Sequence, residues 1–168
     1  MSLSMYDASI PVFVRQFRNL ALILDKAAAY AETKKIDSVV LVNARLAPDM
    51  FPLSRQIQIA SDAAKGCAAR LAEMEVPAFP DNEASIADLQ ARIEKTIHFL
   101  ESINPAAING SEQREISLII GGKTMPFQGK SYLLNFALPN FYFHSTTAYA
   151  ILRHNGVDIG KKDYLGGI

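Results

Sequence analysis

The sequence has little of what several classes of protein require. It contains one cysteine, Cys67, which excludes an internal disulfide and any zinc site built on several thiolates. Lysine and arginine total 17, and so do aspartate and glutamate, which leaves no formal net charge at pH 7. Binding to nucleic acid or to an anionic membrane surface depends on an excess of basic residues, so we expect no nucleic-acid and no membrane partner.

Long apolar stretches are also absent. The longest apolar run, residues 132–143, is interrupted by Asn135, Pro139 and Asn140. It is shorter than the roughly 20 residues that a membrane helix needs. The N-terminal residues lack the basic segment and the continuous apolar stretch of a signal peptide. We therefore expect a cytoplasmic protein of bacterial type.

What the sequence does contain is helical periodicity. Hydrophobic residues make up 49% of its 168 residues and charged residues 20%, which is typical of one globular domain, here residues 1–168. Three apolar stripes alternate spacings of three and four, as amphipathic helices do. Their members are Ile10, Phe13, Phe17, Leu20, Leu24 and Ala27; Leu53, Ile57, Ala60, Ala64, Cys67, Leu71 and Met74; and Ile86, Leu89, Ile93, Ile97 and Leu100. Because Cys67 lies on a stripe, we interpret it as a small core residue.

Local signals mark where these helices begin. Pro11 and Pro52 fall in or just before a first turn, where a missing N–H is tolerated. Ser85 and Asp88 have the spacing of a capping box. Asp37 predicts a further short helical segment, which Pro48 should end.

Between the third and fourth helices the period changes to two. Residues 115–120 alternate, Gly121–Gly122 follows, and the pattern predicts a β-hairpin. The fourth helix is predicted over Ser131–Gly156, with Pro139 opening its hydrogen-bond ladder, and the remaining residues as an extended tail. These elements predict an all-α protein: a four-helix bundle with a small β-hairpin before the last helix.

The fourth helix carries the most informative polar pair. Asn140 and His144 lie four residues apart and therefore on the same helical face, among apolar residues. His144 is either a buried histidine satisfied by hydrogen bonds or a ligand or general base in a pocket. The aromatic residues of this helix lie on all sides of it, so the helix is either fully buried or covered by a partner, which favours a homodimer.

A second polar cluster surrounds the second helix: Arg45, Asp49, Arg55, Gln58, Asp62 and Lys65. One interpretation is a solvated outer face with ion pairs that contribute little stability. The other is the rim of the His144 pocket, to which Arg45 and Asp49 would contribute an anion-binding edge.

Three segments resemble the DinB/YfiT-like metalloenzyme superfamily, in particular an uncharacterised bacterial branch known only as a domain of unknown function. They are RLAPDMFPLSRQIQIASDAAKG (45–66), FALPNFYFHSTTAYAILRHNGV (136–157) and the terminal GKKDYLGG. The resemblance implies a DinB-like bundle of the up-down-down-up type, with a long crossover between the second and third helices. It also implies a dimer.

In the metal-binding members of that superfamily, three histidines converge: one from the second helix and a pair from the fourth. Here His144 matches the second histidine of the pair, and Asn140 stands where the first would be. The comparable part of the second helix offers Gln56 and Gln58. Asp62 is the available carboxylate. Carboxamide oxygens bind Zn²⁺ or Ni²⁺ poorly, so His144 is the one metal ligand that the resemblance retains.

The sequence therefore leaves three functions open. The first, which we favour, is a degenerate-site, non-catalytic or small-molecule-binding dimer without a cofactor, its pocket formed by His144, Asn140, Gln56, Gln58, Asp62 and Arg45. The second is a metal-dependent transferase or hydrolase that uses His144 to bind a divalent metal such as zinc or nickel. The third is a purely structural or regulatory dimer.

Overall fold

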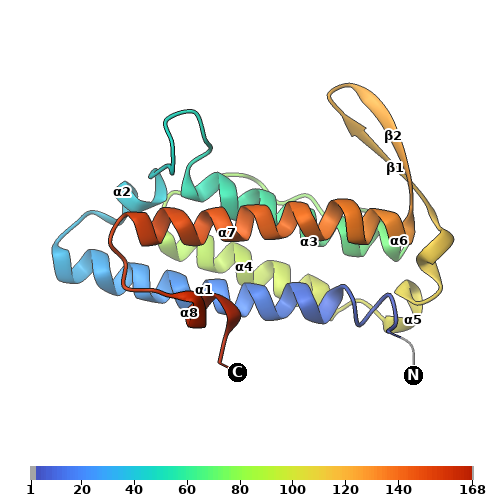
Figure 1. Cartoon of the computed structure of the whole chain (residues 1–168), viewed down its shortest axis with the longest axis horizontal. Helices are drawn as coiled ribbons and strands as arrows, with labels where there is room; N and C mark the ends of the chain where they lie inside the picture. The colour runs from blue at the N-terminus through green and yellow to red at the C-terminus, as the bar shows by residue number, and fades with distance from the viewer. Residues whose placement is uncertain (1–2, 168) are drawn as a thin grey trace.

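Four long helices form the body of the protein in the computed structural model, which describes residues 3–167. They are α1 (Ile10–Lys34), α3 (Leu53–Leu71), α4 (Ile86–Glu101) and α7 (Leu138–His154). Helices α1 and α7 run in one direction, and α3 and α4 run in the other (Figure 1). Helix α3 packs against α4 and α7, while α1 packs against the other side of α4 and α7. This is the up-down-down-up bundle that the resemblance implies.

The core lies where the predicted apolar stripes meet. Every member of the first stripe is buried, and in the other two only Met74 and Ile97 are not. Phe141 of α7 lies between two phenylalanines of α1, with ring centroids 4.9 Å from Phe13 and 5.1 Å from Phe17 in edge-on geometry. Such aromatic contacts add to the free energy gained by burial and fix how α1 and α7 pack. Cys67 is buried, and burial raises the pKa of its thiol, as expected for a core residue.

Short elements join the long helices. They are α2 (Ser38–Val42), α5 (Pro105–Ile108), the 3₁₀ turn η1 (Ser111–Gln113), α6 (Gly129–Tyr132), the π turn η2 (Leu133–Ala137) and α8 (Lys161–Leu165). Asp37 caps α2 as predicted, accepting a hydrogen bond from the Val39 N–H at 3.0 Å. Helix α2 ends at Val42, however, well before Pro48.

The end of α3 corrects one part of the predicted stripe. Glu73 has φ of +53°, and the Met74 N–H donates to the Ala69 carbonyl at 2.8 Å. A left-handed residue followed by such a bond stops an α-helix. Met74 therefore lies beyond α3 and is 48% exposed, although its spacing continues the stripe.

Residues 72–85 form the crossover, the segment that lets α3 and α4 run in the same direction. The side chain of Arg92 on α4 is only 2% exposed and pairs with the Glu83 carboxylate of the crossover at 2.9 Å. Nη2 of Arg92 lies 3.0 Å from the Asp62 carboxylate on α3. Lys65 donates to the Pro77 carbonyl at 2.7 Å. These contacts tie the crossover to both helices that it connects.

The predicted hairpin is present as β1 (Glu115–Ile120) paired antiparallel with β2 (Lys123–Gln128). Gly121 and Gly122 have φ of +57° and +77°, the positive values that a two-residue turn of this kind requires. The hairpin projects from the bundle beside α6 (Figure 1). Near its base Ile116 and Leu118 are buried, whereas Ile119 towards the tip is 81% exposed.

The last long helix is continuous from α6 through η2 to α7. Pro139 has no N–H for the Asn135 carbonyl, and just before it the Leu138 N–H donates to the Leu133 carbonyl, five residues back. This π turn is the opening of the ladder that the sequence predicts at Pro139. The helix begins at Gly129, earlier than expected, and ends at His154.

The C-terminal tail is not fully extended as the sequence predicts. Asp163 accepts a hydrogen bond from the Gly160 N–H at 2.7 Å, which starts the single turn α8. Asn19 of α1 donates to the Tyr164 carbonyl at 3.1 Å, and Lys26 pairs with Asp163 at 2.6 Å. These contacts bind α8 to α1.

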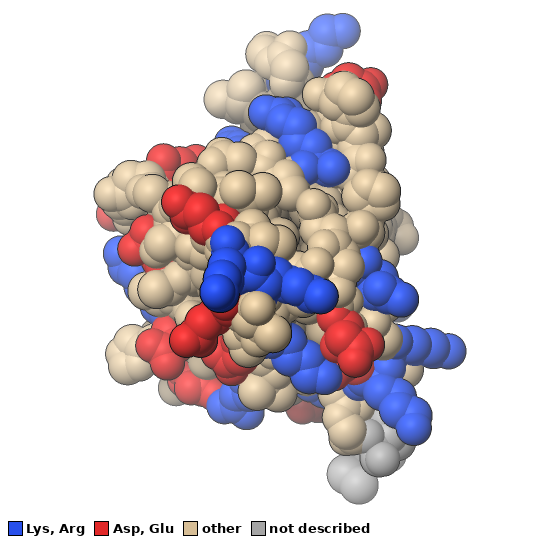
Figure 2. Space-filling model, turned by 90° about the vertical axis from the view of Figure 1, so that its left-hand side faces the viewer, with Lys and Arg blue, Asp and Glu red and all other residues tan. Residues whose placement is uncertain are grey.

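Basic and acidic side chains are interspersed over the end of the bundle that carries α2, with no field of one sign on that face (Figure 2). Within residues 3–167, no helix has both the length and the hydropathy needed to cross a membrane.

The buried ion pairs of the crossover predict an unequal effect of two arginine substitutions. Arg92→Ala should lower the free energy of unfolding by about 3 kcal/mol, because it leaves the nearly buried Glu83 carboxylate without its positively charged partner. Arg18→Ala, the matched control, removes an exposed pair with Glu101 and should cost less than about 1 kcal/mol. Urea unfolding of both variants measures the difference. Equal losses would show that Arg92 does not hold the crossover.

Candidate functional site

His144 lies at the interface of α7 and α3 and is only 9% exposed. Its Nδ1 lies 2.7 Å from Oε1 of Gln56, a buried residue of α3. The Gln56 Nε2 in turn donates to the Phe51 carbonyl at 3.0 Å. A carbonyl can only accept, so this second bond orients the carboxamide and directs its oxygen at the imidazole.

The orientation of Gln56 decides the tautomer of His144. Because Oε1 accepts, Nδ1 carries the proton and Nε2 keeps its lone pair. Burial lowers the pKa of His144, and the positive charge of Arg55 lowers it further. The ring is therefore a neutral hydrogen-bond donor to Gln56 at neutral pH.

The donors around His144 do not fit a transition-metal site. Across residues 3–167, no three His, Cys, Asp or Glu side chains are grouped so that they could hold a metal ion together. The nearest polar partner of the imidazole is the carboxamide of Gln56, whose oxygen is already engaged with Nδ1. One imidazole and a carboxamide are a weak donor set for zinc or nickel.

The other predicted pocket residues lie apart from His144. Gln58 donates to the Glu83 carboxylate of the crossover at 2.8 Å and accepts from Arg55 at 3.1 Å. Asp62 pairs with Arg92 at the same crossover. Arg45 donates to the Met50 carbonyl in the loop before α3. The structure thus brings Gln56 to His144, whereas Gln58 and Arg45 have local structural partners.

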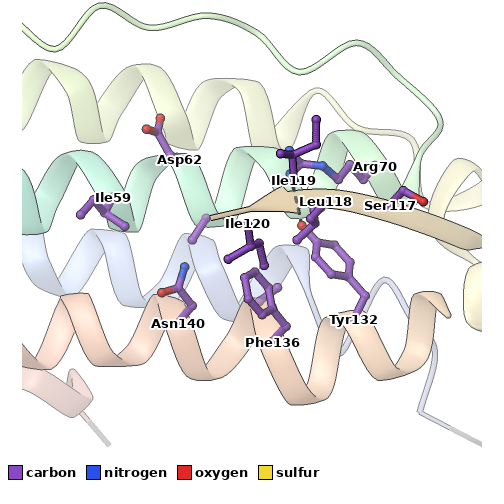
Figure 3. A pocket seen from close by; sticks show the side chains of 12 residues that line it. Ile59, Asp62, Arg70, Ser117, Leu118, Ile119, Ile120, Tyr132, Phe136 and Asn140 are labelled. Carbon is purple, nitrogen blue, oxygen red and sulfur yellow. Dashed lines mark hydrogen bonds between the residues drawn. The ribbon is translucent and has the colours of Figure 1, made fainter. Parts of the chain in front are cut away.

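Asn140 instead lines a cleft of about 550 Å³ between α3, the last helix and β1, and Asp62 lies at the same end (Figure 3). The cleft does not include His144. Apolar side chains form most of its walls: Ile59 and Ala63 from α3, Phe136 and Ala137 from η2, and Leu118, Ile119 and Ile120 from β1. Within residues 3–167, the Asn140 carboxamide has no hydrogen-bond partner.

The opposite end of the cleft carries Arg70 and Tyr132 (Figure 3). Arg70 Nη1 donates to the Tyr132 hydroxyl at 3.2 Å. Burial raises the pKa of Tyr132 to about 12, so its phenol stays protonated at neutral pH. Among the described residues, no carboxylate forms an ion pair with Arg70.

Gly66 makes room for this arginine. A Cβ on Gly66 would overlap with Arg70 Nη1, which shows that the side chain of Arg70 folds back along α3 over the glycine. Glycine in the middle of a helix costs about 1 kcal/mol relative to alanine, so the position needs a reason of this kind. The signal in the sequence is a glycine inside a predicted helix, four residues before an arginine.

A family model described as a domain of unknown function, DUF1993, matches residues 5–165. The chain is also similar to the crystal structure of a DinB family member protein from Shewanella denitrificans, with 44% identity and a TM-score of 0.90. That match covers 97% of this chain and 92% of the other. Among curated proteins, none matches this chain. The two matches confirm the resemblance and the fold, and neither description names a reaction.

The lowered pKa of His144 predicts how stability depends on pH. In the unfolded chain histidine binds a proton below about pH 6.5, whereas the buried ring resists protonation. The unfolded state therefore binds more protons, and the free energy of unfolding should fall as pH drops from 7.5 to 5.5. Urea unfolding at both values should show a smaller fall for His144→Gln. His98→Gln, which changes an exposed histidine, should behave like the wild type, and an unchanged fall in His144→Gln would contradict the assignment.

Proposed function

We propose that this chain, which belongs to the DUF1993 family of DinB-like proteins, binds a small molecule in its cleft and does not catalyse a reaction. The observation that carries the proposal is the cleft between α3, β1 and the last helix, about 550 Å³ in volume. Pockets for small molecules fall in this size range and combine apolar walls with a few polar groups. Here those polar groups are Asn140 at one end and Arg70 with Tyr132 at the other.

The hydrogen bonds of the polar residues support binding rather than catalysis. His144 is engaged with Gln56 and does not line the cleft, so no histidine lies beside the bound molecule. Asp62, the one carboxylate among the residues that line the cleft, is held in ion pairs with Lys65 and Arg92. The cleft thus offers recognition groups without a nucleophile and base in contact.

A metal-dependent transferase or hydrolase is the alternative. It would use the free Nε2 of His144 to bind zinc or nickel. It would also need further ligands, because within residues 3–167 no three His, Cys, Asp or Glu side chains are grouped so that they could hold a metal ion. That function requires near-stoichiometric metal in protein purified without a histidine tag, and loss of the metal in His144→Ala. Elemental analysis of the two proteins decides between the functions.

We propose that the protein acts as a homodimer through the outer face of α7. Tyr142 and Phe143 on this face are exposed, Phe143 by 58%, and Leu46 extends the apolar surface beside them. An exposed apolar patch of this kind is typical of an interface between protein chains. We also propose a bacterial, cytoplasmic protein without a nucleic-acid partner, which the single buried thiol of Cys67 and the balanced charge support.

Filling the cleft should abolish binding. Ala63→Leu adds three carbon atoms to a wall of the cleft, while Ala28→Leu, the matched control, adds them to an exposed position of α1. Ligand-observed NMR with mixtures of six- to ten-carbon carboxylates, amides, alcohols and amines should detect binding to the wild type and to Ala28→Leu but not to Ala63→Leu. If no mixture binds the wild type, or if Ala63→Leu binds equally well, the proposed function is wrong.

A charge on the outer face of α7 should separate the dimer. Phe143→Glu places a carboxylate where the proposed partner packs, and desolvating it would cost several kcal/mol, as burial of an unpaired charge does. Sedimentation equilibrium should give a monomer for this variant and a dimer for the wild type. Leu22→Glu changes an equally exposed apolar residue of α1 and should remain dimeric. If the Phe143→Glu variant is a dimer and the Leu22→Glu variant is a monomer, the interface lies on α1 and the proposed interface is wrong.

A further inference from the structure

The two ends of the cleft differ in chemistry, so a bound molecule would have one preferred orientation. At one end the guanidinium of Arg70 carries a positive charge, and its only side-chain partner among the described residues is the neutral Tyr132 phenol. At the other end the charge of Asp62 is compensated by Arg92 and Lys65. The net charge available to a bound molecule is therefore the single positive charge of Arg70.

The hydrogen bonds at Arg70 leave donors for a ligand. The Tyr132 oxygen accepts from Arg70 Nη1, so its own proton remains free to donate. The high pKa of about 12 keeps that proton on the phenol at neutral pH. A guanidinium and a phenol side by side present parallel donors, which suit the two oxygens of a carboxylate.

The walls between the two ends are apolar. Phe136 lies between Arg70 and Asn140, and Ile120 of the hairpin lies above it (Figure 3). Ala63 of α3, one turn before Cys67, also lines the cleft. Asp62 and Arg70 are eight positions apart in α3, a span of about 12 Å along the helix. A molecule that extends from Arg70 to Asn140 therefore needs an apolar body of about this length.

We infer that the cleft binds an amphipathic monocarboxylate, with its carboxylate on Arg70 and Tyr132, its apolar body along Ala63 and Phe136, and its far end at Asn140. This inference rests on the proposed function and adds the class of ligand. A single guanidinium balances one negative charge, whereas a phosphate monoester brings up to two. The carboxylate also supplies Arg70 with the counter-charge that the protein does not provide.

Octanoate is the probe for this inference, with octanamide as its neutral analogue and octyl phosphate as its dianionic one. Isothermal titration calorimetry should show octanoate binding to the wild type at least tenfold more tightly than octanamide, as a charge-assisted bond implies. Octyl phosphate should bind no more tightly than octanoate. Arg70→Gln should weaken octanoate roughly tenfold to a hundredfold and leave octanamide unchanged. Arg70→Lys keeps the charge but not the planar fork, so its affinity for octanoate should lie between those of the wild type and Arg70→Gln.

Gly66→Ala tests the same site without changing any charge. Its Cβ would occupy the place of Arg70 Nη1 and displace the guanidinium from Tyr132, so octanoate should again bind more weakly. Alanine favours a helix more than glycine does, so this variant should fold even if an Arg70 variant does not. Gly160→Ala is the matched control, because a Cβ there has no neighbour within 4 Å, and it should bind octanoate like the wild type.

The outcomes separate this inference from the proposed function. If octanamide binds as tightly as octanoate, or if Arg70→Gln and Gly66→Ala leave octanoate binding unchanged, the carboxylate assignment is wrong although the cleft still binds a small molecule. Tighter binding of octyl phosphate would likewise overturn it in favour of a phosphate ester. Binding that Ala63→Leu does not reduce would place the molecule outside the cleft and overturn both.

Discussion

The arrangement of this bundle depends on the crossover, residues 72–85, and on the buried Arg92 that holds it. Two consecutive helices can run in the same direction only if the chain between them returns along the bundle, and such a segment has few apolar contacts of its own. Arg92 replaces those contacts with charged ones: it pairs with Glu83 of the crossover and with Asp62 of α3. Because the crossover lies over the polar side of α3, it engages residues that would otherwise have been available to a ligand, among them Gln58.

Pro139 is the second constraint, since it shapes the helix that forms one wall of the cleft. The missing N–H of the proline is accommodated by the π turn η2, from which Phe136 and Ala137 face the cleft. A π turn inserts one residue and shifts the side chains before it around the helix axis. The residues before and after Pro139, including Tyr132 and Asn140, thus line one cleft together.

The elements could be predicted from the sequence because their signals are local. Apolar spacing, the cap at Asp37, the glycines of the hairpin and the proline in the last helix each act within a few residues. The candidate site could be predicted only in part. The resemblance put His144, Gln56 and Gln58 in one candidate pocket without saying which glutamine contacts the histidine. Arg70 was missed, since its role depends on Gly66 beside it and on a hairpin about fifty residues away lying over α3. Burial of Arg92 depends likewise on the distant crossover.

The contrast between the two ends of the α3–α7 interface indicates where recognition takes place. Nδ1 of His144 has its acceptor in Gln56, and Gln56 Nε2 has its own acceptor in Phe51, so these two side chains hold each other in place without a ligand. In the cleft, Asn140 has no partner among the described residues, and Arg70 has only a neutral one. A polar group that lacks a partner beside apolar walls gains free energy when a ligand supplies one, whereas a satisfied group gains little. On the proposed function, this DinB-like bundle, in which His144 is the one metal-ligand histidine that the resemblance retains, would recognise a molecule through the cleft, while His144 joins α7 to α3 through Gln56.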